Sequence, residues 1–126
     1  FLEECSADGP AVVVARSRDG RRRVPGFGHP IYRGLDPRFA SLLAAVRQLD
    51  TTGERMAIVD DAIATVGQAM PQQPNIDLAL GALTWVANLD TDVPIFAVAR
   101  IAGWAAHYAE ELDERPVRYR GLARNP

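Results

Sequence analysis

Residues 26–38 read GFGHPIYRGLDPR, a stretch that predicts a glycine-rich loop followed by the start of a helix. Gly26 and Gly28 can adopt backbone angles that other residues avoid, and they let a ligand approach the main chain closely. His29 stands between Gly28 and Pro30, so we expect its imidazole to project from a loop. Composition alone favours the simpler interpretation, an ordinary Gly/Pro turn that carries a surface histidine.

The end of this stretch predicts a helix start beside positive charge. Asp36 is a good N-cap, and Pro37 fits the first helical position because its missing N–H needs no partner there. Arg33 and Arg38 flank that helix start and place two cations near His29. The arrangement indicates an anion-binding site that contains a proton donor.

Composition limits the classes of function. With 126 residues and 48% hydrophobic side chains, the chain is long enough for one domain with a real core. All 14 basic residues are arginines and the formal net charge is -2, which argues against nucleic acid or a membrane surface as a general partner. The single cysteine, Cys5, excludes an internal disulfide and fits a reducing compartment. We therefore expect a cytoplasmic protein.

Apolar residues recur at helical spacing along most of the chain, which predicts an all-α fold. We expect helices at residues 1–7, 10–18, 37–49, 53–70, 76–89 and 93–112. Thr52 is the predicted cap of the fourth helix, and the small residues of the last helix predict a buried face. Arg100 on that helix either extends to the surface or meets a bound carboxylate.

The segment MPQQPNID, residues 70–77, leads into the fifth helix. Its prolines hold the approach extended, and Asn75 is a good N-cap. Asp77 then falls in the first turn of the helix, where an acidic residue complements the helix dipole. Taken alone, Asp77 needs no role beyond that.

Four blocks together resemble the citrate synthase family, and the resemblance covers residues 1–121. The first block is the Gly-aromatic-Gly-His stretch with its Asp-Pro-Arg ending at Arg38. The second is Pro-Asn-Ile-Asp ending at Asp77, and the third is Arg-Ile-Ala-Gly-Trp beginning at Arg100. The fourth is Arg-Pro beginning at Arg115, followed by Tyr-Arg-Gly.

The resemblance implies roles for individual residues. Asp77 would be the base that removes a proton from acetyl-CoA, and His29 would donate to the carbonyl of oxaloacetate. Three arginines would hold carboxylates, Arg38, Arg100 and Arg115. Arg33 would lie near a phosphate, and the arginines at positions 16, 18 and 21–23 are either a solvated face or an electrostatic lure for it. The backbone that would receive the adenine of coenzyme A comprises Val24, Pro25, Gly26, Phe27 and Gly28.

The resemblance also implies a domain organisation and an assembly. Residues 1–90 would correspond to the family's small domain, and residues 91–126 to a helix and tail of its large domain. The family's other catalytic histidine precedes the equivalent of Phe1, so we expect the chain to need a missing N-terminal portion for turnover. Arg115 would reach the active site of the neighbouring subunit, which implies a homodimer. Coenzyme A would be a substrate, with no permanently bound cofactor.

Alternatives remain at this point. Where the family often carries a lysine before the second block, this chain has Met70 and two glutamines, which weakens the inference of coenzyme A binding. The chain could be a non-catalytic module that binds coenzyme A or a dicarboxylate, or that serves assembly. A citryl-CoA lyase that runs the reverse cleavage is a third, related possibility.

Overall fold

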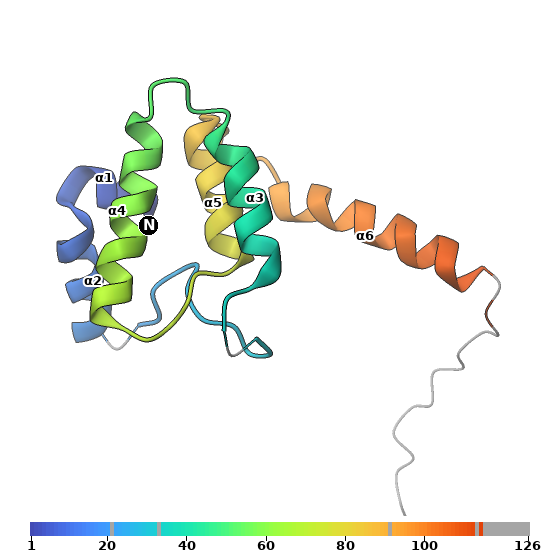
Figure 1. Cartoon of the computed structure of the whole chain (residues 1–126), viewed down its shortest axis with the longest axis horizontal. Coiled ribbons are helices and arrows are strands. Elements are labelled where there is room, and N and C mark those ends of the chain that lie inside the picture. Colours follow the sequence, from blue (N-terminus) through green and yellow to red (C-terminus); the bar gives the residue numbers. More distant parts are fainter. Residues whose placement is uncertain (21, 33, 91, 113, 115–126) are drawn as a thin grey trace, which may run out of the picture. The chain divides into compact units, whose positions relative to one another are not determined.

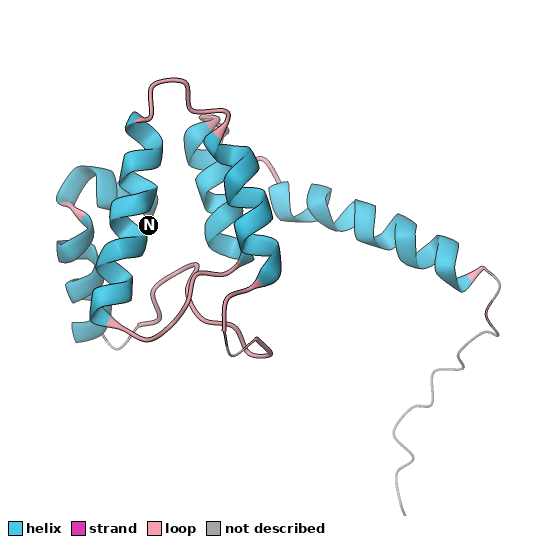
Figure 2. Ribbon diagram, viewed as in Figure 1, coloured by secondary structure: helices cyan, strands magenta, loops and turns pink. Residues whose placement is uncertain are grey.

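The computed structural model describes residues 1–20, 22–32, 34–90, 92–112 and 114. These residues form helices and loops, and the described part of the chain contains no β-strand (Figures 1 and 2). The helices are α1 (Leu2–Asp8), α2 (Pro10–Asp19), α3 (Pro37–Arg47), α4 (Glu54–Ala69), α5 (Ile76–Val86) and α6 (Ile95–Glu111). The predicted all-α class is confirmed.

The chain divides into two compact units, Phe1–Val93 and Pro94–Pro126, which we describe separately. The assignment of residues 1–90 to a small domain and of 91–126 to a large one stays a prediction. None of the described helices is long and apolar enough to cross a membrane.

The core of the first unit is built by α1–α5, as the ribbon in Figure 1 shows. α3 packs chiefly against α5, and α2 packs against α4. The most deeply buried side chains recur at helical spacing, for example Val59, Ala62 and Val66 on α4. Full burial of each larger apolar side chain stabilises the fold by about 1.5–3 kcal/mol. The third helix, expected over residues 37–49, ends at Arg47, and Leu49 beyond its end is exposed.

The start of α4 differs from the prediction. Its N-cap is Gly53 and not Thr52, and the cap position makes no side-chain hydrogen bond. Two preceding side chains serve the first turn instead: the Thr52 hydroxyl accepts from the N–H of Glu54 at 3.3 Å, and the Asp50 carboxylate accepts from the N–H groups of Gly53 at 3.0 Å and Met56 at 2.7 Å. A threonine and an aspartate before the cap therefore satisfy the first turn of the helix.

In the second unit, all 17 residues of α6 lie within the described chain and none of them is buried. The small-residue face of α6, predicted to be buried, is thus exposed within this unit. Large apolar side chains on α6 are half or more exposed, among them Phe96, Trp104 and Tyr108. The apolar side chains of α6 are therefore not packed into a hydrophobic core within this unit.

Candidate active site

Two segments far apart in the sequence meet at the N-terminus of α5. The N–H of Gly28 donates to the carbonyl of Gln73 at 2.8 Å, and the N–H of Asn75 donates to the carbonyl of Gly26 at 2.9 Å. The Asn75 side chain also donates to the carbonyl of Gly28 at 2.5 Å, across 47 positions of sequence. The glycine-rich loop is thus fixed to the segment that leads to Asp77.

Gly26 allows this close approach. Its φ is +82°, and a Cβ atom built there would lie 2.7 Å from the Cβ of Leu78 and 2.9 Å from its Cα. Any other residue would need both a left-handed backbone and the displacement of α5. The sequence expectation for Gly26, close approach to the main chain, holds here for a helix of the same chain.

His29 is half-buried in the loop, and its ring orientation is fixed by the backbone. Its Nδ1 atom accepts from the N–H groups of Ile31 and Tyr32, each at 3.1 Å. An imidazole nitrogen that accepts a hydrogen bond carries no proton, so the hydrogen-bond pattern assigns the proton of the neutral ring to Nε2. Nε2 is then the atom that can donate to a ligand.

Asp36 is 1% exposed and joins α3 to α5. One oxygen, Oδ1, accepts from the Arg38 main-chain N–H at 3.1 Å and from its Nε at 2.9 Å. The other, Oδ2, accepts from Arg38 Nη2 at 2.8 Å and from the N–H of Ile76 at 3.2 Å. The side-chain hydrogen bonds from Arg38 hold the pKa of the Asp36 carboxyl well below its usual range, against the opposing effect of burial.

The bidentate pair with Asp36 leaves part of the Arg38 guanidinium free. Nε and one N–H of Nη2 are used by Asp36, so an edge formed by Nη1 and Nη2 remains for a second carboxylate. Arg38 is 52% exposed, and Nη2 lies 3.4 Å from Nε2 of His29. Hydrogen bonding to Asp36 raises the pKa of Arg38, against the opposing effect of burial.

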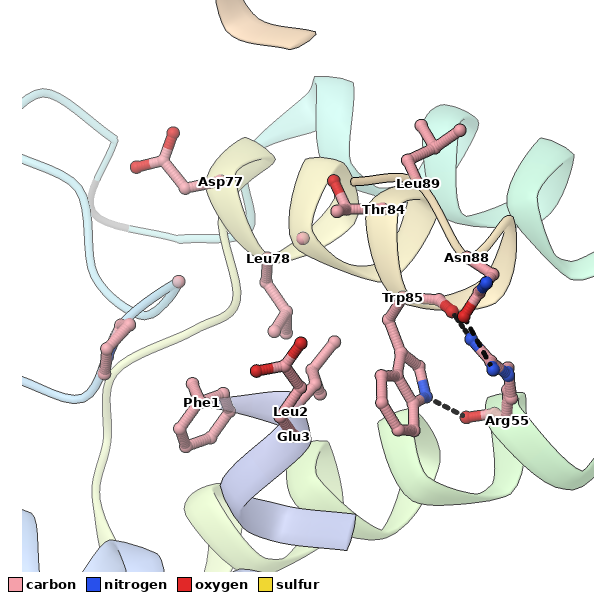
Figure 3. A pocket seen from close by; sticks show the side chains of 13 residues that line it. Phe1, Leu2, Glu3, Arg55, Asp77, Leu78, Thr84, Trp85, Asn88 and Leu89 are labelled. Carbon is pink, nitrogen blue, oxygen red and sulfur yellow. Dashed lines mark hydrogen bonds between the residues drawn. The ribbon is translucent and has the colours of Figure 1, made fainter. Parts of the chain in front are cut away.

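Asp77 is exposed in the first turn of α5, and its N–H donates to the Asn75 side chain at 2.9 Å. It stands at the edge of a cavity of about 400 Å³ between α1, α4 and α5 (Figure 3). The cavity is lined by Phe1, Leu2, Glu3, Pro25, Gly26, Arg55, Asp77, Leu78, Gly81, Thr84, Trp85, Asn88 and Leu89. Part of the predicted coenzyme A loop and the predicted base thus share one cavity.

A second cluster on this cavity was not predicted from the sequence. Arg55 donates to the main-chain carbonyl of Trp85 and to the side chain of Asn88, and its guanidinium lies 4.8 Å from the Trp85 ring centroid (Figure 3). The indole N–H of Trp85 donates in return to the Arg55 carbonyl at 3.2 Å. α4 and the end of α5 are locked together by these contacts, which join residues 30 or more positions apart and leave no local signal.

The other predicted site residues fall in different places. In the loop, the side chains of Val24 and Phe27 are buried in the core. Arg100 lies in the second unit, exposed, with its guanidinium 4.8 Å from the Phe96 ring centroid. Binding of a carboxylate by Arg100 stays a prediction. Arg33 and Arg115 lie outside the described residues.

The structure shows contacts of Asp36 and Tyr32, two residues of the first block, that the sequence did not predict. Sequence alone marks Asp36 as a helix cap, whereas the structure adds its bonds to the Arg38 side chain and to Ile76. It likewise brings the ring of Tyr32 against His29. Among the described residues, no cluster of three or more His, Cys, Asp or Glu side chains could hold a metal ion.

The fold and site define an all-helical protein whose glycine-rich loop presents a histidine donor and an arginine beside a helix that begins with an aspartate. Residues 1–120 match the family model "Citrate synthase, C-terminal domain". The chain belongs to the citrate synthase family.

Several curated relatives are similar to this chain. "Citrate synthase 2" of Bacillus subtilis is 35% identical over 100 residues, which cover 74% of this chain and 26% of that protein. "Citrate synthase" of Synechocystis is 32% identical over 122 residues, which cover 90% of this chain and 31% of that protein. "2-methylcitrate synthase 1" of Corynebacterium glutamicum is 28% identical over 105 residues, which cover 79% of this chain and 28% of that protein. The chain thus spans roughly a quarter to a third of the length of these relatives.

A solved structure is also similar. The "Structure of citryl-CoA lyase from Hydrogenobacter thermophilus" superposes on the whole of this chain and on 55% of its own, with a TM-score of 0.71 and 25% sequence identity. The fold described above is therefore that of a known citrate-synthase-like protein.

Proposed function

We propose that this chain is part of an enzyme that condenses acetyl-CoA, or a close acyl-CoA, with oxaloacetate. The observation that carries the proposal is the convergence of two donors, Nε2 of His29 in the loop and Nη2 of Arg38 in the first turn of α3, which lie 3.4 Å apart. Membership of the citrate synthase family supports it.

A 2-oxo acid fits these donors because its carbonyl carbon is bonded directly to a carboxylate. The free edge of Arg38 binds that carboxylate in two bonds, and the Nε2–H of His29 donates to the neighbouring carbonyl oxygen. Negative charge develops on this oxygen when the new carbon–carbon bond forms, so a donor fixed beforehand stabilises the transition state.

Asp77 supplies the base in this proposal. It removes a proton from the carbon next to the thioester carbonyl, and that carbon then attacks the oxo carbon of oxaloacetate. Hydrolysis of the thioester by water releases coenzyme A and the tricarboxylic acid. Asp77 lies in the first turn of α5, at the edge of the cavity that part of the glycine-rich loop lines.

Binding of two negatively charged substrates needs further cations. The charges of Asp36 and Arg38 cancel, so this pair orients a substrate carboxylate but adds little net electrostatic attraction for it. Arg100 and the partner-reaching Arg115 supply the remaining positive charge in a homodimer, and Arg33 supports a coenzyme A phosphate. The adenine rests on the main chain of residues 24–28, and the protein works in the cytoplasm.

Cleavage of citryl-CoA is a second candidate function. The similar solved structure is titled as a citryl-CoA lyase, and such a reaction uses the same carbon–carbon bond in the opposite direction. The intact Asp-Pro-Arg block ending at Arg38 favours condensation, as do the synthase names of the relatives given above.

Release of free thiol distinguishes the candidates. We expect the 126-residue chain, given acetyl-CoA and oxaloacetate, to show no turnover, and the complete protein with its N-terminal portion to release coenzyme A steadily. Conversion of citryl-CoA alone into acetyl-CoA and oxaloacetate, with no release of free thiol, would instead assign the lyase. Binding of coenzyme A without either reaction in the complete protein would assign a binding module and refute the proposal.

A further inference from the structure

The side chain of Tyr32 contacts both donors of the proposed site. Its ring lies against the His29 imidazole, with centroids 4.7 Å apart and planes tilted by 41°. The guanidinium carbon of Arg38 lies 5.6 Å from the centroid of the same ring. In addition, the main-chain N–H of Tyr32 is one of the two that bond Nδ1 of His29. One residue therefore contacts the histidine twice and the arginine once.

The two donors need such support because they do not bond each other. Nε2 of His29 carries the ring proton, and Nη2 of Arg38 can only donate, so their 3.4 Å separation brings two N–H groups together. Asp36 holds the arginine from one side through its carboxylate. The imidazole has only the loop backbone and a neighbouring ring to oppose its rotation away.

We infer that Tyr32 is a positioning residue that holds His29 and Arg38 in register for a 2-oxo acid. The inference rests on the proposed function for its ligand, although the contacts do not. An aromatic ring suits this task because its face attracts the guanidinium while a tilted pairing accommodates the imidazole. The ring is the part that acts, since the Tyr32 hydroxyl makes no hydrogen bond to any described residue.

Two substitutions of Tyr32 distinguish the effect of its aromatic ring from the effect of side-chain size. Tyr32→Phe keeps the ring and removes the hydroxyl, whereas Tyr32→Leu keeps an apolar side chain and removes the ring. Both leave the main-chain N–H in place. Tyr32 is 39% exposed, so neither change opens a cavity in the core. His107, exposed on α6, serves as an internal control in the same sample.

The primary measurement is ring ¹⁵N NMR of the labelled 126-residue chain without substrate. We expect the wild type and Tyr32→Phe to show His29 mainly as the Nε2–H tautomer, with cross-relaxation between the His29 and Tyr32 ring protons in the wild type. Tyr32→Leu should lower the ratio of this tautomer to the other by roughly 2- to 10-fold, the effect of one lost aromatic pair. His107 should be unchanged in every sample.

Two results would overturn the inference. One is a Tyr32→Leu spectrum in which His29 matches the wild type, and the other is the absence of ring-to-ring cross-relaxation in the wild type, which needs no variant. In the complete protein, kcat should fall in Tyr32→Leu and return in Tyr32→Phe, with the KM for acyl-CoA unchanged. The NMR result stands whether or not the protein condenses these substrates, so the failure of each proposal is seen separately.

Discussion

Replacement of Asp36 by asparagine should destabilise the fold far more than a matched change on the surface. Asparagine has the same shape but only one accepting oxygen. That oxygen can still accept from the main-chain N–H and Nε of Arg38, while the new amide faces Arg38 Nη2 and the Ile76 N–H, both donors. Two of the four hydrogen bonds to Asp36 are therefore lost.

The magnitude follows from those two bonds. A hydrogen bond to a charged group contributes about 1.5–3 kcal/mol, and a buried N–H left without a partner costs about 1–3 kcal/mol. Allowing for partial relaxation, we expect Asp36→Asn to lower the free energy of unfolding by about 2–5 kcal/mol. The matched control is Asp60→Asn, because Asp60 pairs in two bonds of 2.7 Å with Arg47 while both side chains are 48% exposed. Loss of that pair should cost only about 0.2–1 kcal/mol.

Urea denaturation of the two variants and the wild type, followed by circular dichroism, measures the difference. Equal free energies of unfolding for Asp36→Asn and Asp60→Asn would refute the account of Asp36 as the junction of α3 and α5. A second signature is the pH dependence. Because folding lowers the pKa of Asp36, its contribution is fully present above the unfolded pKa of about 3.9 and is lost as the pH falls through the folded pKa. The gap between wild type and Asp36→Asn should therefore narrow below about pH 4.

Three further substitutions test other contacts. Gly26→Ala should cost about 2–4 kcal/mol by urea denaturation because its Cβ meets Leu78, whereas Gly34→Ala, with open space around it, should stay within about 0.5 kcal/mol; equal effects would contradict the close approach. Arg55→Met should lower stability by about 1–2 kcal/mol through lost bonds to the end of α5, and an unchanged midpoint would remove that role. In the complete protein, Arg115→Ala should weaken dicarboxylate binding by roughly 1.5–3 kcal/mol. Mixed with subunits that lack the proposed base, it should regain activity, and mixtures that stay inactive would exclude action across the interface.

The helices were predictable because apolar residues repeat at helical spacing and because caps are local. Asn75 caps α5 as expected, accepting from the N–H of Asp77. Asp36 likewise caps α3, with Pro37 in its first turn. The start of α4 was predicted only in part because two cap-forming residues, Asp50 and Thr52, stand close together, and both side chains accept from N–H groups of the first turn. Local patterns therefore predict where the helices lie, but they fix the helix ends only to within a few residues.

The site was predictable only in part. The motif placed Arg38 at a helix start near His29, and the structure brings their side chains to 3.4 Å. The bond from Asp36 to Ile76 spans 40 positions, so no local pattern reports it. Likewise, the small-residue face of α6 indicates close packing without naming the segment that packs against it. Contacts between distant segments need coordinates.

The most direct test of the proposed function separates chemistry from binding at Asp77. In the complete protein, Asp77→Asn keeps the size of the side chain and removes the base. The proposal predicts a loss of nearly all coenzyme A release from acetyl-CoA and oxaloacetate, while the dissociation constant for oxaloacetate, measured by calorimetry, stays near that of the wild type. Turnover at the wild-type rate would contradict the proposal and would leave Asp77 as an acid that only complements the dipole of α5.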